Sequence, residues 1–116
     1  MHINYHNKSV QEVCTDARKA KKKYGAPVAD KLLSTITFIE AAETLLDVRD
    51  FPVYHFHALK GELKKLYAID LGRKLGWRLI VRPMMGDRPA TNEEIFGREV
   101  VKIQIIEVKE VSNHYA

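Results

Sequence analysis

The stretch His55-Phe56-His57-Ala58-Leu59-Lys60-Gly61 holds the densest group of side chains that could do chemistry. Histidine exchanges a proton near neutral pH. Lysine or arginine can stabilise the extra negative charge on a phosphorane-like transition state. RNA carries its own nucleophile, the 2′-hydroxyl group, so its cleavage requires neither a metal ion nor a covalent intermediate. These residue types therefore suit cleavage of an RNA phosphodiester.

Roles for individual residues follow from the same chemistry. His57 or His114 could act as base or acid, and Lys60, Arg78 and Arg82 could hold the phosphate. A His and Lys cluster in a basic protein is more often an ordinary solvated surface, so the cluster alone does not establish a site.

Three other kinds of site have less support. His55 and His57 could place two imidazoles on one side of an extended strand, with His114 as a third zinc ligand, but no acidic or cysteine ligand lies at a telling spacing. Cys14 lies on an apolar helical stripe, so we expect it in the core rather than as a nucleophile. The chain has no Walker loop and no Rossmann glycine pattern. We therefore expect no metal and no cofactor.

The overall composition fits a single domain over residues 1–116, with a net charge of +4. Basic residues concentrate in residues 1–39 and 60–82, which points to a polyanion partner, although a solvated lysine-rich surface is the alternative. The N-terminus has no apolar signal core, and the apolar runs are too short to cross a bilayer. A single cysteine, Cys14, fits a reducing compartment. We therefore expect a cytoplasmic protein that does not bind membranes.

The first half of the chain predicts a short strand followed by two helices. Residues 3–5 alternate between apolar and polar side chains. Ser9-Val10-Gln11-Glu12 matches a capping box, so a helix is expected to start there. Gly25 suits its end, and Pro27 suits the first turn of a second helix. The apolar stripe of that helix continues to about residue 47.

The second half of the chain predicts strands, because the apolar period changes to two. The expected strands are residues 66–71, 77–82 and 100–108. Residues 72–76, with glycine at both ends, are expected to join the first two as a hairpin loop. Residues 83–98 are expected to be a loop, and residues 110–116 a polar tail.

This order predicts an α+β fold in which two N-terminal helices pack on one face of a small antiparallel sheet. In the strand 77–82, Trp77, Leu79 and Val81 share one face, which should pack against the helices. The opposite face then carries two arginines, Arg78 and Arg82, and is open.

The chain also resembles a known group of proteins. Three segments resemble the central block of HigB-type toxins of the RelE/ParE superfamily: His57 to Gly61, Tyr67 to Leu71 and Trp77 to Val81. Tyr5 to Lys8 and the helix that follows are similar to the start of the plasmid maintenance or killer protein branch. Ile105 to Val108, followed by His114-Tyr115, resembles its end. The order and spacing of the motifs carry the resemblance, which excludes only residues 83–98.

The resemblance implies a RelE/ParE-like α+β domain and the toxin of a type II toxin–antitoxin system. Such a toxin is a ribosome-dependent endonuclease (an mRNA interferase) that cleaves mRNA in the decoding site. It has a cognate antitoxin, often with a DNA-binding domain, and reaches operator DNA only through the antitoxin complex. His57, Lys60, Arg78 and His114 match the motif positions and are the implied catalytic residues.

Binding to the RNA backbone is expected from further cations. We assign ribosome or RNA contacts to Lys64, Lys65, Arg73, Lys74 and Arg82, with Tyr115 as a possible stacking residue.

Two departures from the family pattern matter. Many relatives have an arginine where this chain has Asp70, and a carboxylate there would repel phosphate if it faced the cleft. The usual Asp-Tyr pair before the last histidine is replaced by Ser112-Asn113. These changes leave room for a different RNA target or an attenuated protein. Two alternatives therefore stand beside the interferase: a non-enzymatic RelE/ParE-like toxin that poisons DNA gyrase, and a plain RNA- or ribosome-binding module.

Overall fold

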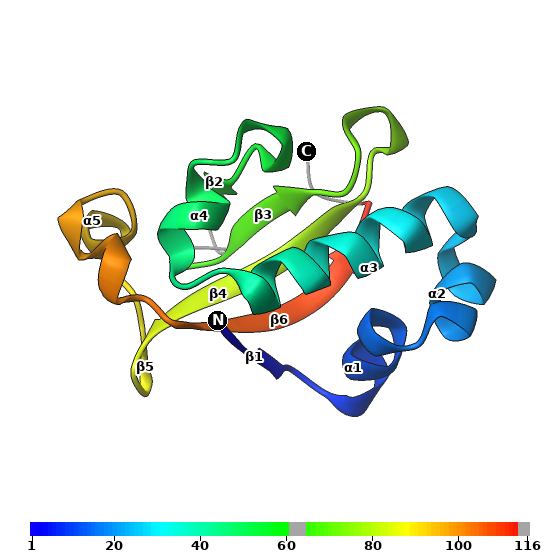
Figure 1. Cartoon of the computed structure of the whole chain (residues 1–116), viewed down its shortest axis with the longest axis horizontal. Helices are drawn as coiled ribbons and strands as arrows, with labels where there is room; N and C mark the ends of the chain where they lie inside the picture. Colours follow the sequence, from blue (N-terminus) through cyan, green and yellow to red (C-terminus); the bar gives the residue numbers. More distant parts are fainter. Residues whose placement is uncertain (61–64, 114–116) are drawn as a thin grey trace.

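The structure, a computed structural model, describes residues 1–60 and 65–113, with only the backbone of Arg73. It is a mixed α/β fold (Figure 1). Its helices are α1 (Lys8–Thr15), α2 (Ala17–Tyr24), α3 (Ala26–Ala41), α4 (Leu45–Arg49) and α5 (Asn92–Ile95), with 3-10 turns η1 (Pro52–Tyr54), η3 (Arg73–Leu75) and η4 (Arg98–Lys102). Its strands are β1 (His2–Tyr5), β2 (His57–Ala58), β3 (Tyr67–Asp70), β4 (Arg78–Met85), β5 (Arg88–Pro89) and β6 (Ile105–Ser112).

These strands form one sheet within the described part of the chain. The order is β1-β6-β4-β3-β2, and β5 pairs with the far end of β4. β1 runs parallel to β6, whereas the other pairs are antiparallel. The sheet is therefore mixed, and the expectation of a purely antiparallel sheet was wrong at this one edge.

The N-terminal helical region begins and divides at positions that differ from the prediction. Asn7, not Ser9, caps α1, because its side chain accepts a hydrogen bond from the backbone N–H of Val10 at 2.9 Å. The expected single helix is also two helices. Asp16 leaves the helical conformation, and its carboxylate accepts hydrogen bonds from the N–H groups of Arg18 and Lys19 to start α2.

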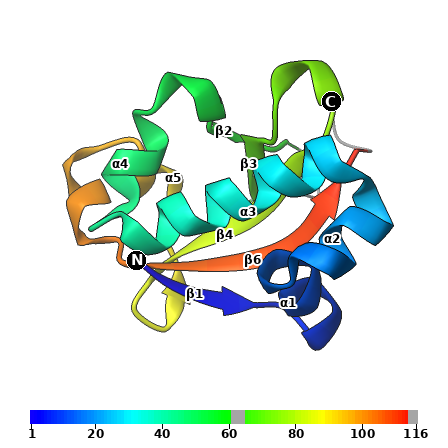
Figure 2. The same cartoon turned by 45° about the vertical axis from the view of Figure 1, so that its right-hand side comes forward.

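Helix α3 is the main partner of the sheet. Gly25, with a φ of 85°, ends α2 as predicted, and Pro27 lies in the first turn of α3. Figures 1 and 2 show α3 crossing one face of the sheet. The buried side chains of α3 include Leu32 and Ile39, which belong to one hydrophobic core. This packing fixes the position of the β3–β4 hairpin relative to the helices.

The strand β4 has the two faces that the sequence predicts. Leu79 and Val81 are fully buried in the core with the helices. Arg78 and Arg82 lie on the opposite face, each paired with an acidic side chain. We call this side of the sheet the open face. Ile80 also belongs to it and is nevertheless buried.

The segment after β4 departs most from the sequence prediction. Residues 83–98 are not one loop, because β4 continues to Met85 and the segment then contains β5 and α5. Thr91 and Glu94 form a complete capping box at the start of α5. The last strand is also shifted, since residues 98–102 form η4 and β6 runs from 105 to 112. Residues 110–112 are thus paired strand rather than tail.

In the part of the chain that the structure describes, no helix is both long enough and apolar enough to cross a membrane.

Candidate functional site

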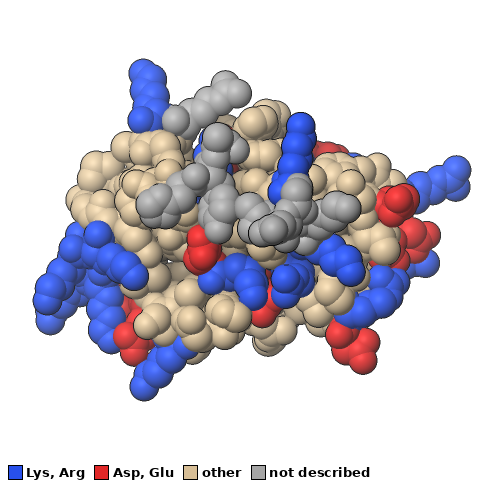
Figure 3. Space-filling model, turned by 180° about the vertical axis from the view of Figure 1, so that it is seen from behind, with Lys and Arg blue, Asp and Glu red and all other residues tan. Residues whose placement is uncertain are grey.

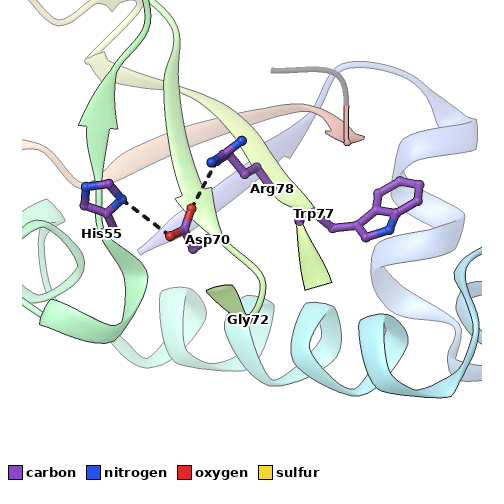
Figure 4. A pocket seen from close by; sticks show the side chains of 6 residues that line it. His55, Asp70, Gly72, Trp77 and Arg78 are labelled. Atoms are coloured by element: carbon purple, nitrogen blue, oxygen red, sulfur yellow. Dashed lines mark hydrogen bonds and ion pairs between the residues drawn. The ribbon is translucent and has the colours of Figure 1, made fainter. Parts of the chain in front are cut away.

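A pocket of about 260 Å³ lies at the hairpin end of the sheet (Figure 4). Its walls come from the residue after η1, from the end of β3, from the hairpin loop and from the start of β4. The residues that line it are His55, Asp70, Gly72, Gly76, Trp77 and Arg78. The pocket therefore joins a segment before β2 to both strands of the β3–β4 hairpin.

Asp70 is the centre of this pocket. Its side chain is only 6% exposed. Arg78 Nε donates a hydrogen bond to Asp70 Oδ1 at 3.1 Å, and His55 Nδ1 lies 3.4 Å from Asp70 Oδ2. A buried carboxylate is costly unless opposite charge and hydrogen-bond donors compensate it. Arg78 and His55 supply that compensation from two sides, as Figure 4 shows.

His55 has an unusual backbone conformation. Its φ and ψ are 43° and 49°, the left-handed helical region, and its N–H donates to the carbonyl oxygen of Pro52 at 3.1 Å. Few residues other than glycine adopt this region, which costs some conformational energy. The turn directs the half-exposed His55 ring toward Asp70. The sequence suggested a role for His55 only as a zinc ligand, and its contact with Asp70 was not predicted.

His57, the first residue of β2, lies beside His55. The two ring centroids are 4.8 Å apart, and the rings are tilted by 32°. His57 Nδ1 lies 2.8 Å from the carbonyl oxygen of His55. Because a carbonyl only accepts, Nδ1 carries the proton in the neutral ring and Nε2 keeps its lone pair. His57 is thus prepared to accept a proton at Nε2.

Neither His57 nor Lys60, which stand in one sequence motif, is among the residues that line the pocket. Lys60 lines a separate groove, together with Ala58, Leu59, Lys65, Tyr67, Thr91, Asn92 and Glu93. Successive side chains alternate across a strand, and Ala58, opposite Tyr67 in the register, is on the face that does not carry His57. The chain after β2 then brings Lys60 to this second groove.

Arg82 is also outside the pocket. It lies four residues along β4 from Arg78, roughly 13 Å away at the rise of a strand. Its Nη1 donates to Glu107 Oε1 at 3.2 Å. His6 Nδ1 lies 3.9 Å from Glu107 Oε2, and Lys109 Nζ lies 3.1 Å from the same nitrogen of His6. Arg82 therefore belongs to a second polar cluster on the open face.

The hairpin tip carries the predicted RNA-binding cation Lys74. It is exposed and lies in η3, between the two glycines that line the pocket. Lys65 is exposed as well. For Arg73 the structure describes only the backbone, which lies in η3. Lys64, His114 and Tyr115 lie outside the described residues.

The open face is rich in cations. Figure 3 shows the molecule from behind, with Lys and Arg side chains along much of this face and Asp and Glu side chains among them. The strand register puts Arg78 and Arg82 here, and Lys109 Nζ lies 3.1 Å from His6 Nδ1 beside the Arg82 cluster. Such a face attracts phosphate groups, and carboxylates such as Asp70 and Glu107 moderate its charge.

Two weaker candidates from the sequence can now be placed. Within residues 1–60 and 65–113, no group of three His, Cys, Asp or Glu side chains is arranged to hold a metal ion. Cys14 is 1% exposed in the core, and burial raises the pKa of its thiol to about 12. Cys14 therefore packs as an apolar residue, as the helical stripe predicts.

No known family model matches the chain, and no curated protein matches it in sequence. The resemblance to RelE/ParE toxins thus rests on the motifs described above.

Proposed function

We propose that the protein is the toxin of a type II toxin–antitoxin system, of the RelE/ParE superfamily and closest to the HigB branch, and that it cleaves translated mRNA. The observation that carries the proposal is the grouping of two imidazoles and a guanidinium around one pocket. His55 and Arg78 line the pocket, and the His57 ring lies beside His55 with ring centroids 4.8 Å apart. These are the groups that metal-independent cleavage of RNA needs.

The proposed reaction is a transesterification. The 2′-oxygen attacks the adjacent phosphorus, the bond from phosphorus to the 5′-oxygen breaks, and the products carry a 2′,3′-cyclic phosphate and a 5′-hydroxyl group. His57 Nε2 takes the proton of the 2′-hydroxyl group, because Nδ1 donates to a carbonyl oxygen. Arg78 binds the phosphate through its guanidinium group, and Asp70 orients that group by accepting a hydrogen bond from Nε.

Binding to the ribosome is assigned to the cations around the hairpin. Lys74 extends from the loop that forms one wall of the pocket, so contacts with the RNA backbone there would bring an mRNA phosphate to Arg78. The sequence adds Lys64, Lys65, Arg73 and Arg82, with Tyr115 as a stacking residue, and the motif comparison adds Lys60 and His114 to the catalytic set. Binding should weaken steeply with salt.

The fold is compatible with this proposal. The α3 helix covers one face of the sheet, and Arg78 lies on the other. We expect a cytoplasmic protein that needs no cofactor and is held inactive by a cognate antitoxin. Operator DNA would be bound only through that complex.

One observation favours a second function, an attenuated ribosome- or RNA-binding module. Asp70 partly neutralises Arg78, which reduces the positive charge available to a phosphorane. Such a protein would occupy ribosomes without cutting the message.

The proposal is tested by primer extension on a reporter mRNA after brief induction of the protein in bacterial cells. Cuts within the translated region, lost when the start codon is removed and lost in a His57→Ala variant, would support the interferase. Intact mRNA despite growth arrest would reject it, and inhibited supercoiling by the purified protein would then indicate gyrase as the target. Intact mRNA on occupied ribosomes would indicate the binding module.

A further inference from the structure

The contact between His55 and Asp70 adds a second proton-transfer group to the pocket. We infer that His55 is the general acid of the proposed cleavage, with Asp70 as the residue that positions it. The inference rests on the proposed function and adds a role that the motif comparison does not assign to either residue. It follows from three features of the described structure: the orientation of the ring, the charge around it and the geometry of the neighbouring imidazole.

The orientation of the His55 ring determines which nitrogen faces the substrate. Nδ1 lies 3.4 Å from Asp70 Oδ2, so Nδ1 is the ring nitrogen on the side of the carboxylate. The other ring nitrogen, Nε2, points away from Asp70 in Figure 4. His55 lines the pocket and its side chain is 54% exposed, so RNA can approach it. Nε2 is therefore the atom that exchanges a proton with the substrate.

Charged and polar groups surround His55. Three described groups face it, which are Asp70 from β3, Arg78 from β4 and His57 from β2. Asp70 offers one oxygen to His55 and the other to Arg78, and so stands between the two cations. A proton donor at His55 would stand beside Arg78 in the pocket, and both groups complement a phosphate that gains negative charge.

The two imidazoles differ in the partner of Nδ1. In His57 that partner is a neutral carbonyl oxygen at 2.8 Å, whereas in His55 it is a carboxylate. We assign the acid to His55, whose Nδ1 lies against an anionic oxygen, and the base to His57, whose Nδ1 lies against a carbonyl oxygen. With ring centroids 4.8 Å apart, both rings can reach one phosphodiester.

The proton balance of the step is then complete. His57 Nε2 receives the proton of the 2′-hydroxyl group as the 2′-oxygen forms its bond to phosphorus. His55 Nε2 gives its proton to the 5′-oxygen as the bond from phosphorus to that oxygen breaks. Proton exchange with water restores both rings. The left-handed backbone of His55 fits this role, since strained conformations are retained where they direct a functional side chain.

The experiment replaces the leaving 5′-oxygen of one mRNA linkage by sulfur, in a ribosome complex stalled with that linkage in the decoding site. A thiolate leaves without a proton, so it needs no general acid. We expect His55→Ala to cut the oxygen substrate about 10²- to 10⁴-fold more slowly than wild type does, and the sulfur substrate within about tenfold of wild type. His57→Ala is the matched control, and it should lose activity on both substrates because the base is still needed.

A second pair of variants separates positioning from folding. Asp70→Asn should lose less of the cleavage rate on the oxygen substrate than His55→Ala does. Its rate on the sulfur substrate should return to within about tenfold of wild type. His55→Asn keeps a residue that tolerates the left-handed turn and should behave as His55→Ala does, which guards against loss of folding in the alanine variant.

The inference is overturned if His55→Ala and His55→Asn lose activity equally on both substrates, or lose none on the oxygen substrate. If wild type cuts neither substrate, the proposed function fails first, and the inference fails with it. The two failures are thus distinguishable by the wild-type lanes.

Discussion

Arg78 Nε donates a hydrogen bond to Asp70 Oδ1, 3.1 Å away, between two residues that face each other across the β3–β4 hairpin. Asp70, which departs from the pattern of the toxins that the chain resembles, is therefore not an unpaired negative charge. It is buried, it orients Arg78, and its second oxygen reaches His55. Asp70 is thus both the residue that departs from that pattern and the residue that contacts His55 and Arg78 in the pocket.

The Arg78–Asp70 pair should be coupled in stability. Arg78→Ala leaves a buried carboxylate without its guanidinium, and we expect a loss of about 1–3 kcal/mol in the free energy of unfolding. The Asp70→Asn/Arg78→Ala double variant should lose less than Arg78→Ala alone, because the uncompensated charge is gone. Urea denaturation of wild type, Asp70→Asn, Arg78→Ala and the double variant measures the coupling energy between the two side chains. Additive losses would show that the pair does not interact.

The hairpin tip should bind RNA through its charge. Lys74→Ala should weaken binding to ribosomes and lower the slope of log affinity against log salt by about one. Lys102→Ala is the matched control, because Lys102 is equally exposed but precedes β6 at the other end of the sheet. Equal effects of the two variants would argue against a specific role for the hairpin.

Cys14 should be inert in the folded protein. Burial raises the pKa of its thiol to about 12, so almost no thiolate exists at neutral pH. We expect alkylation by iodoacetamide to be very slow in native buffer and fast in urea. Labelling of the native protein at the rate of a free thiol would place Cys14 outside the core.

Glu94 should make the protein less stable in acid. Hydrogen bonds from Arg88 and from the Thr91 backbone lower the pKa of this carboxyl group from 4.5 to about 2. Because the folded pKa is depressed, its stabilisation is complete above pH 4.5 and is lost as the pH falls toward about 2. Glu94→Gln should therefore lose less stability over this range than wild type, as measured by thermal unfolding. Parallel pH profiles would contradict the capping role.

Parts of the fold could be predicted because the signals are local. Gly25 and Pro27 mark the boundary between α2 and α3, as the structure confirms. The break at Asp16 could not be seen in the same way, because the apolar stripe continues past it through Ala20. The predicted strand at 100–108 began too early for a different reason. A run of apolar residues does not by itself show whether the segment pairs with another strand. Here that segment is the 3-10 turn η4, and pairing begins at Ile105.

The site could have been predicted further than it was. A loop over residues 72–76 places Leu71 against Trp77, and hence Asp70 against Arg78, so the register alone predicts their ion pair. The Thr91–Glu94 capping box was likewise present in the sequence. The position of His55 was not predictable, because a left-handed histidine carries no local signal and its contact with Asp70 joins segments that are distant in sequence.

The central claim is tested most directly with purified protein, a translating ribosome and an end-labelled mRNA. The account predicts cleavage only in the presence of ribosomes, with a 2′,3′-cyclic phosphate on the upstream fragment, and a loss of about 10²- to 10⁴-fold in His57→Ala. Full occupancy of the ribosomes with intact mRNA would contradict it. So would fragments that end in a 5′-phosphate, since the 2′-hydroxyl group would then not be the nucleophile.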